Sequence, residues 1–238
     1  MEFFIGTSGW AYSWNEEGTL SWYVKNTKSN AVELNASFYR FPYRNQIVSW
    51  IKKGAKLRWS IKVNRTITHR FRLSDRSYYV FSKFLEAFKP MEKAGLIDFY
   101  LIQLPPTFMP KAKNVERIKA FLNEFSEIKN KLAFEFRHEE WFSETWVNFF
   151  KRLEVVFVSI DAPGFESKIF KTTDKIYLRL HGRTSWYSHI YSKEELIDIL
   201  ERIIKLEPEK VYIFLNNDHG MLPTEEKIIE ILESKGLW

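Results

Sequence analysis

The sequence predicts an α/β protein that folds as a single (β/α)8 barrel. Eight short β-rich runs recur along the 238 residues, and stretches with the three- and four-residue apolar spacing of helices lie between them. Each run also gains polar residues at its C-terminal end, where barrels of this kind carry their functional groups. A doubly wound open sheet is the alternative fold that the same alternation permits.

The eight predicted strands are short runs rich in β-branched and aromatic residues, as strands require. They are FFIGTSG from Phe3, AVELN from Ala31, RWSIKV from Arg58, DFYLIQL from Asp98, LAFEF from Leu132, VVFVSID from Val155, IYLRLHG from Ile176 and VYIFLNND from Val211.

Four intervening stretches have the clearest helical signals. The predicted helices span residues 74–95, 114–128, 192–206 and 224–236. Ser74 is the predicted N-cap of the first and Gly95 its end, and Ser192 with Glu195 forms a predicted capping box. Pro223 directly precedes the last helix.

The unit after the sixth strand is irregular. Residues 162–174, APGFESKIFKTTD, contain Pro, Gly and polar residues where a helix would be expected, so we predict a loop there. No Gly/Ser-rich linker, low-complexity tract or close repeat interrupts the chain. The sequence therefore predicts one barrel domain over residues 1–238, with the helix after strand six replaced by a loop.

Composition restricts the chemistry. Hydrophobic residues make up 45% and aromatic residues 17% of the chain, enough for a sizeable core. The sequence has no cysteine, which excludes disulfides, thiolate metal sites, cysteine nucleophiles and iron–sulfur clusters. A net charge of +6 favours anionic partners, although a lysine-rich surface has the same effect. Richness in Lys and Glu without Cys also suits a thermophile.

The sequence predicts a cytoplasmic protein. Its N-terminus, MEFFIGTSGW, has no basic region followed by a long apolar stretch, and no apolar run reaches membrane-spanning length. We therefore expect no membrane partner. The oligomeric state stays open.

The stretch LAFEFRHEEW (132–141) raises the question of function. Leu132, Phe134 and Phe136 mark a buried strand, yet Glu135 and Arg137 alternate with them on its other face. In a barrel that other face meets the central axis, so polar side chains near the C-terminal mouth can form a pocket. An internal ion-pair network without chemistry is the alternative, since buried charges need partners.

The candidate site consists of polar residues at strand ends and in the following loops. Glu135 and Asp161 are candidate general acid and base, with His181 as a proton carrier near neutral pH. The predicted substrate-binding residues are Ser8, Trp10, Glu33, Asn35, Lys62, His69, Gln103, Arg137, His138, Arg179, Asn216 and Asn217. Among these, the cationic side chains suit an anion, and the aromatic ring suits stacking on a sugar or base.

No cofactor is required by this reading, but two alternatives use the same residues. A divalent ion, Zn²⁺ or Mn²⁺, could take ligands from the set Glu33, Glu135, Asp161, His181 and Asp218. Three nearby basic side chains oppose such an ion, and no HxH or HExxH spacing is present. A Schiff base on Lys62 is the second alternative, opposed by any ion pair that keeps its amine protonated.

Seven motifs in order resemble the family called domain of unknown function 72, or YecE-like. They are IGTSGW, VELNASFYRFP, TITH, QLPPTF, FEFRHEEW, YLRLHG with YSKEEL, and FLNND, which span Ile5 to Asp218. The resemblance implies a TIM-like barrel but no reaction. The fold's similarity to xylose-isomerase-like and endonuclease IV-like barrels implies a sugar-phosphate or DNA role only by analogy.

Three functions follow from these observations. The first is an enzyme, hydrolase-like or acting on sugar phosphates, whose substrate is phosphorylated, sugar-containing or a nucleic-acid phosphodiester. The second is a non-catalytic module that binds nucleic acid or a phosphorylated metabolite. The third is a structural protein whose polar interior serves folding alone.

Overall fold

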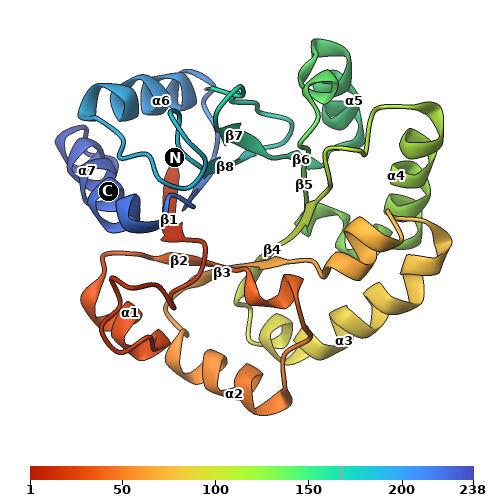
Figure 1. Ribbon diagram of the computed structural model, residues 1–238, viewed down its shortest axis with the longest axis horizontal. Helices are drawn as coiled ribbons and strands as arrows, with labels where there is room; N and C mark the ends of the chain where they lie inside the picture. The colour runs from red at the N-terminus through yellow and green to blue at the C-terminus, as the bar shows by residue number, and fades with distance from the viewer. Residues whose placement is uncertain (167) are drawn as a thin grey trace.

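Parallel strands form one sheet that curls around a central axis in the computed structural model (Figure 1). The structure describes residues 1–166 and 168–238, and over these residues the sheet order is β6-β5-β4-β3-β2-β1-β9-β8-β7. The strands are β1 (Glu2–Thr7), β2 (Ala31–Leu34), β3 (Arg58–Lys62), β4 (Ile97–Gln103), β5 (Leu132–Glu135), β6 (Val156–Phe157), β7 (Ser159–Asp161), β8 (Lys175–Leu180) and β9 (Lys210–Leu215).

The eight predicted strands are all present, and the sixth is divided into two. β6 pairs with β5, whereas β7 pairs with β8, so one continuous segment joins the two ends of the sheet. Val158 lies between them and donates its backbone N–H to Phe134 O at 2.8 Å. The predicted barrel is therefore confirmed, and the doubly wound alternative is not.

The helices surround the strands (Figure 1). They are α1 (Leu20–Asn26), α2 (Arg44–Lys53), α3 (Tyr78–Lys93), α4 (Ala112–Glu124), α5 (Glu144–Leu153), α6 (Lys193–Lys205) and α7 (Met221–Ser234). Short turns of helix lie between them: η1 (Ala36–Phe38), the π-helix η2 (Thr66–Arg70), η3 (Asp75–Ser77), η4 (Ser126–Lys131), η5 (Glu139–Phe142) and η6 (Asp218–Gly220).

Helix boundaries follow the sequence signals with two exceptions, at Ser74 and at Pro223, which was predicted to precede the last helix. Ser192 accepts from Glu195 N at 3.2 Å and the Glu195 carboxylate accepts from Ser192 N at 2.8 Å, so the capping box is present. Pro223 falls in the first turn of α7, where its missing N–H costs nothing. Ser74 is not the N-cap of α3, because a 3-10 turn (η3) lies between them.

A loop replaces the helix after the sixth strand, as predicted. Among the described residues between β7 and β8, Lys168 forms an antiparallel bridge with Ile160. Thr172 accepts from Phe157 N at 2.9 Å and donates to Val155 O at 2.7 Å. The loop thus doubles back along the strand that precedes it and supplies the hydrogen bonds that a neighbouring strand would supply.

Aromatic side chains fill the lower part of the barrel interior. Phe99 packs against Tyr212 and Tyr177, with ring centroids 4.8 and 5.2 Å apart, and Tyr177 also packs against Phe214 at 4.9 Å. These rings alternate along their strands with residues that face the helices. They form a floor on which the polar residues nearer the C-terminal mouth rest.

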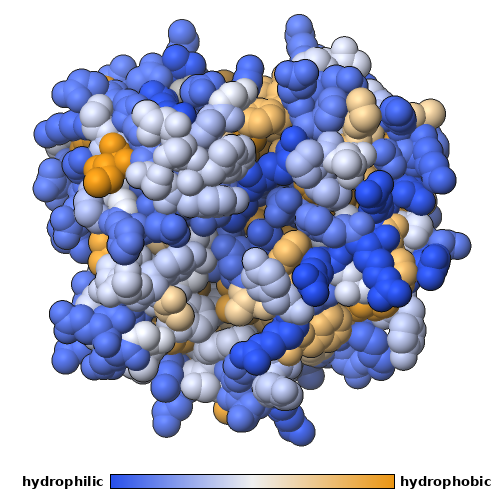
Figure 2. Space-filling view, in the orientation of Figure 1, coloured by the Kyte–Doolittle hydropathy of each residue, from blue (hydrophilic) through white to orange (hydrophobic). Residues whose placement is uncertain are grey.

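A second apolar layer separates the strands from the helices. It contains Phe81, Phe84 and Phe88 of α3 and the buried face of α6. The end of the barrel that faces the viewer in Figure 2 is mainly hydrophilic, and hydrophobic side chains occupy smaller areas between the polar ones. Within residues 1–166 and 168–238, every helix is too short or too polar to cross a membrane.

Strands β1 and β2 approach closely at Gly6, and Tyr23 ties them together. A Cβ on Gly6 would lie 2.0 Å from Ala31 O, so only glycine fits there. The fully buried Tyr23 hydroxyl accepts from Thr7 N at 3.1 Å and donates to Ala31 O at 3.0 Å. One hydroxyl of α1 therefore satisfies a backbone donor on β1 and a backbone acceptor on β2.

We expect Tyr23→Phe to lower the free energy of unfolding by about 2 kcal/mol, because it leaves a buried N–H and a buried C=O without partners. Urea denaturation followed by circular dichroism measures the change. Tyr79→Phe is the control, since Tyr79 is 73% exposed and should shift stability by less than about 0.5 kcal/mol. Equal effects of the two substitutions would contradict this role of Tyr23.

Candidate functional site

The buried guanidinium of Arg179 lies at the centre of the barrel mouth. Arg179 is in β8 and has no exposed surface. Its Nη2 lies 2.6 Å from Glu33 Oε1 of β2, and its Nη1 lies 2.6 Å from Glu135 Oε2 of β5. Both carboxylates are also fully buried, so three distant segments are joined by charge-assisted hydrogen bonds across the barrel.

The Glu33 carboxylate has a second support from below. Tyr177, two residues before Arg179 on the same face of β8, donates its hydroxyl to Glu33 Oε2 at 2.6 Å. The Ser60 hydroxyl lies 2.7 Å from the same tyrosine oxygen. Tyr177 belongs to the aromatic floor, so the charged residues are held in place by the packed rings beneath them.

The Glu135 carboxylate is shared between two arginines. Arg179 binds one oxygen, and Arg137, two residues further along the chain, forms an ion pair with the other. Burial alone would raise the pKa of Glu135, but attraction to Arg137, Arg179 and Lys62 outweighs it and holds the pKa below its usual value. Glu135 is therefore ionised at neutral pH.

His181 is a buried neutral ring. Burial first, and then Arg137, Arg179 and Lys62, lower its pKa well below the usual range. Arg137 Nη2 donates to His181 Nε2 at 3.1 Å, because a guanidinium has no acceptor. The ring proton then resides on Nδ1, which lies 3.1 Å from the Asn216 amide. In the structure Asn216 Nδ2 faces the ring and Asn216 Oδ1 accepts from Ser8 Oγ at 2.8 Å; turning the amide by 180° lets Oδ1 accept the Nδ1 proton and the NH₂ group donate to Ser8 Oγ.

Lys62 is the third cation of the mouth. It follows Ser60 on the inner face at the end of β3, and its Nζ lies 4.7 Å from the centroid of the Phe38 ring. Burial, followed by repulsion from Arg179, lowers the Lys62 pKa to about 8. His69 of η2 packs edge-on against the same Phe38 ring at 5.0 Å, and its pKa falls to about 4 through burial and the charge of Lys62.

We call Glu33, Lys62, Glu135, Arg137, Arg179 and His181 the charged cluster. Two carboxylates in it face three cations, since His181 is neutral. One positive charge of the cluster is therefore uncompensated by its own members. This excess lies at the C-terminal end of the barrel, where Lys62 is mostly buried and the Arg137 side chain is 10% exposed.

A depression of about 420 Å³ opens beside Arg137. Gln103 and Pro106 line one part of it, and Phe165, Trp186 and Tyr187 line the rest. The Arg137 guanidinium carbon lies 4.7 Å from the centroid of the Trp186 ring, a cation–π contact. The depression therefore combines a cation with aromatic and amide surfaces.

Asp161 does not join the charged cluster. Val158 and Ile160 face the barrel interior, so Asp161 shares the opposite face with Phe157, which packs toward the helices. Its buried carboxylate accepts from Arg183 Nε at 2.9 and 3.2 Å. The expectation that Asp161 works beside Glu135 as an acid or base is corrected by this placement, because alternation along β7 turns it away from the axis.

Three other predicted site residues contact neighbouring residues of the protein. Trp10 packs edge-on against Trp50 and Trp59, with centroids 5.9 Å apart in each case. The His138 ring accepts from Glu140 N at 3.4 Å at the start of η5. Asn217 is fully buried and donates to His189 O at 2.8 Å.

The remaining predicted residues lie at the mouth. Ser8 and Asn35 line its β1–β2 side, where Asn35 Nδ2 donates to Ser8 O at 3.1 Å. Asn35 Oδ1 and Arg137 Nε are buried without a hydrogen-bond partner among the described residues. These two atoms therefore have hydrogen-bonding capacity left for a ligand.

The metal-ligand set considered above is not assembled. Over the described residues, no group of three or more His, Cys, Asp or Glu side chains has an arrangement that could hold an ion. Glu33 and Glu135 are bound by arginines, and Asp161 by Arg183. These side chains do not fit a divalent cation in this arrangement.

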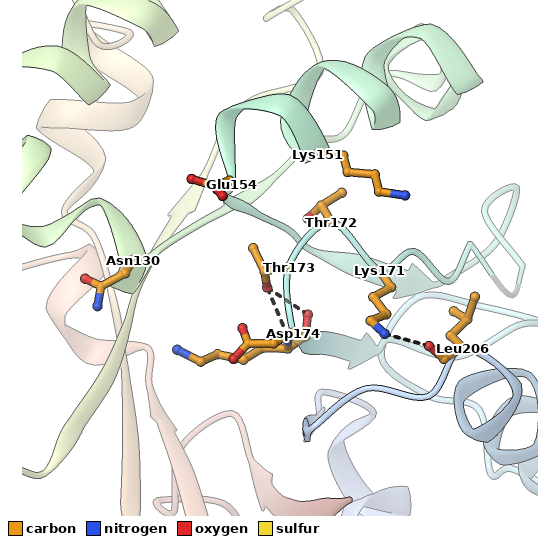
Figure 3. Close-up of a pocket in the computed structure, with 9 residues that line it drawn as sticks. Asn130, Lys151, Glu154, Lys171, Thr172, Thr173, Asp174 and Leu206 are labelled. Atoms are coloured by element: carbon orange, nitrogen blue, oxygen red, sulfur yellow. Dashed lines mark hydrogen bonds between the residues drawn. The ribbon is translucent and has the colours of Figure 1, made fainter.

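A larger cavity, of about 800 Å³, lies at the opposite end of the barrel (Figure 3). It is lined by Asn130, Lys151, Glu154, Lys171, Thr172, Thr173, Asp174, Lys175 and Leu206. Lys171 donates to Leu206 O at 2.9 Å and so caps α6. Lys175 begins β8, so this cavity is at the N-terminal end of the strands, where barrel residues serve stability.

The predicted substrate-binding residues did not include Tyr177. Tyr177 has the same parity on its strand as Arg179, which is the signal that places it under the same carboxylate. Phe38 comes from the short turn after β2, and the sequence indicates it only as one of several aromatic residues in the loops at the mouth. Arg183 was also missed; it comes from the loop after β8 and binds Asp161.

A parallel barrel with a charged cluster under its C-terminal mouth defines the class of protein. The chain belongs to the family described as "Protein of unknown function DUF72", whose profile matches residues 4–226. The resemblance in the motifs is therefore confirmed. A comparison with curated proteins found no match.

Solved structures of this family have the same fold. A DUF72 family protein of Thermotoga maritima MSB8 is 25% identical with a TM-score of 0.80, covering 98% of this chain and 100% of that one. One of Enterococcus faecalis V583 is 19% identical with a TM-score of 0.84, covering 97% and 95%. SacUVDE, at 10% identity and a TM-score of 0.53 over both full chains, shares the barrel more distantly.

We expect Arg179→Met to lower the free energy of unfolding by about 3–5 kcal/mol at pH 7.5, because it leaves two buried carboxylates with fewer cations. In the native protein the lowered pKa of Glu135 adds stability above about pH 4.5, which is lost on acidification. In the variant, Glu135 has lost one of the cations that offset its burial, so its pKa rises and stability should instead increase from pH 8 to pH 5. Urea unfolding across this range measures both slopes.

Two further variants test the cause. Adding Glu33→Gln to Arg179→Met should recover part of the lost stability, because it removes a buried charge that has lost its partner. Arg202→Met is the matched control, since the Arg202 side chain is 55% exposed and forms an ion pair only with Asp198 among the described residues. A double variant less stable than Arg179→Met would contradict the assignment.

Proposed function

We propose that this protein is an enzyme that acts on an anionic substrate at the C-terminal mouth of the barrel. The substrate is phosphorylated and sugar-containing, or is a nucleic-acid phosphodiester. The observation that carries the proposal is the charge of the cluster, in which two carboxylates face three cations beside a solvent-accessible depression.

The uncompensated charge favours an anion for a physical reason. Charges in a partly desolvated mouth interact through a lower effective dielectric than in water, so each unit of imbalance is felt more strongly. Arg179 is fully buried with both terminal nitrogens bound to carboxylates. The cations that remain for a ligand are therefore Lys62 and Arg137, which are partly buried.

Polar groups around these cations suit a hydroxylated or phosphorylated ligand. Arg137 Nε and Asn35 Oδ1 offer one donor and one acceptor that have no partner among the described residues. Gln103 lines the depression next to Arg137, and Trp186 and Tyr187 offer faces for a sugar or base. These groups would orient the ligand while Arg137 and Lys62 bind its charge.

The contacts of His181 and Glu135 lead us to assign them roles other than the proton transfer that the sequence predicts. His181 is neutral and its Nε2 is occupied by Arg137, so we assign it to positioning that guanidinium. Glu135 is ionised and held by Arg137 and Arg179. Lys62, whose pKa is about 8, is the group of the cluster that changes protonation near neutral pH.

We expect inorganic phosphate to bind the mouth and to bind at least about tenfold more weakly in Arg137→Met and Lys62→Met, because each removes one of the partly buried cations. Isothermal titration calorimetry measures the affinity, and a phosphate-soaked crystal should place the anion within hydrogen-bond distance of Arg137. Lys175→Met is the control, because Lys175 lines the cavity at the opposite end.

An anion found only among Lys151, Lys171 and Lys175 would contradict the proposal. Turnover is tested separately with a pooled set of phosphodiesters and sugar phosphates. Variants that lose phosphate binding should lose any activity found, whereas Lys175→Met should retain it.

A second candidate function, a non-catalytic module for nucleic acid, is favoured by the basic rim beside β3. A depression of about 450 Å³ there is lined by Arg65, Thr66, His69 and Arg70. Arg70 and Arg76 lie over the face of Phe71, at 5.5 and 4.9 Å from its centroid. Cations interleaved with aromatic rings are typical of surfaces that bind single-stranded nucleic acid.

For the binding module, we expect a single-stranded oligonucleotide to bind without turnover and with a strong salt dependence. The double substitution Arg65→Ser and Arg70→Ser should reduce the slope of log K against log salt by about 1–2, because two phosphate contacts are lost. Fluorescence anisotropy at several salt concentrations measures the slope. Lys113→Ser and Lys119→Ser on the outer helix α4 serve as the matched control.

A further inference from the structure

The Lys62 amine differs from every other charged group of the cluster in having no ionic partner. Within the part of the chain that the structure describes, no hydrogen bond or ion pair joins Lys62 Nζ to another residue. Its Nζ makes a cation–π contact with the Phe38 ring, 4.7 Å from the ring centroid. Arg137, Arg179, Glu33 and Glu135 are all paired.

The two carboxylates that could neutralise Lys62 are committed to arginines. Arg179 holds Glu33 and Glu135 at 2.6 Å each, and Arg137 binds the second oxygen of Glu135. An ion pair that would keep the Lys62 amine protonated and immobile is therefore not formed. Because the arginines bind both carboxylates, the Lys62 amine at the end of β3 has no ion-pair partner among the described residues.

The surroundings favour the neutral amine. Burial is the main cause of its lowered pKa of about 8, and Arg179 and Arg137 lower it further, while Glu33 and Glu135 act in the opposite direction. His69, on the neighbouring turn, is neutral at pH 7, because its pKa is about 4. At pH 7 the nucleophilic form is then more abundant than in an ordinary lysine by roughly two orders of magnitude.

We infer that Lys62 is a covalent site: its amine forms an imine with the carbonyl carbon of an anionic aldehyde or ketone, such as an open-chain sugar phosphate. This inference rests on the proposed function for the anionic part of the ligand. The neutral amine supplies the nucleophile, and the Arg137 guanidinium supplies the cation that binds the phosphate.

The covalent step balances without a further reactant. The Lys62 nitrogen attacks the carbonyl carbon, a C–N bond forms, and the carbonyl π electrons move to oxygen, which takes up one of the two protons of that nitrogen. The carbinolamine then loses its hydroxyl as water while nitrogen loses its remaining proton. Amine and carbonyl thus give imine and water, with no change of oxidation state. Protonation of the imine gives an iminium ion, which withdraws electrons from the adjacent carbon.

The cluster is suited to both charges in this sequence. Arg137 and Arg179 both act electrostatically on Lys62, and their positive charge favours the negative charge that develops on the carbonyl oxygen. Glu33 and Glu135 contribute the opposite field, which favours the iminium ion that follows. The iminium ion carries the same positive charge as the lysine ammonium ion, so its formation requires no additional counter-ion.

The test uses a matched pair of probes, glyceraldehyde and glyceraldehyde 3-phosphate, each with sodium cyanoborohydride to reduce the imine to a stable secondary amine. Peptide mapping by mass spectrometry then gives the rate of labelling at each lysine of the intact protein. We expect Lys62 to be labelled by glyceraldehyde 3-phosphate at least about tenfold faster than Lys113, an exposed lysine on α4. Its rate should level off near pH 8, whereas that of Lys113 keeps rising.

Lys62→Arg separates the covalent role from simple anion binding. It keeps the positive charge but cannot form an imine, so phosphate should still bind while labelling at position 62 is lost. Lys113→Arg is the control and should leave Lys62 labelling unchanged.

The outcomes distinguish this inference from the proposed function. Phosphate binding with Lys62 labelled no faster than Lys113 by either probe would overturn the imine and leave the anion site standing. Fast labelling of Lys62 by both probes, without phosphate binding, would support the reactive amine and overturn the anion site. Preference for the phosphorylated probe supports both.

Discussion

The bridge that Arg179 makes between Glu33 and Glu135 organises the whole mouth of the barrel. A single guanidinium binds one carboxylate from β2 and another from β5, two strands that are separated by β3 and β4 in the sheet. All three groups are fully buried, so each would be strongly unfavourable without the others. The bridge therefore requires the barrel to be closed with a definite register, because a shift of one residue would turn any member to the other face.

The same bridge decides which cations remain for a ligand. Arg179 satisfies its carboxylates so fully that Lys62 has no ion pair among the described residues. Arg137 belongs both to the ion-pair network and to the ligand site, since it binds Glu135 and His181 and also lines the depression. An internal ion-pair network and a ligand site are thus not alternatives in this protein. The network holds the partly buried cations in place, and its excess positive charge is what a ligand would encounter.

The sequence predicted the framework well and the pairings poorly. Strand alternation placed Glu33, Glu135 and Arg179 on the inner face, and the Ser192–Glu195 box identified the start of α6, because both signals depend on local geometry. Asp161 was assigned to the barrel interior because it is the polar residue at the C-terminal end of its strand. The inner face of that segment is the one that carries Val158 and Ile160. The π-helix η2 and the division of the sixth strand could not be predicted, since both depend on tertiary contacts. Which carboxylate binds which cation is equally a property of three dimensions.

The π-helical turn at Thr66–Arg70 places unusual demands on chain length. A π turn contains one residue more than an α turn, and it directs His69 onto the Phe38 ring beside Lys62. Loss of a single residue here would convert the turn to ordinary α geometry and swing the following side chains by about 100° around its axis. Relatives that keep this lysine environment should therefore tolerate substitutions in the segment far better than insertions or deletions.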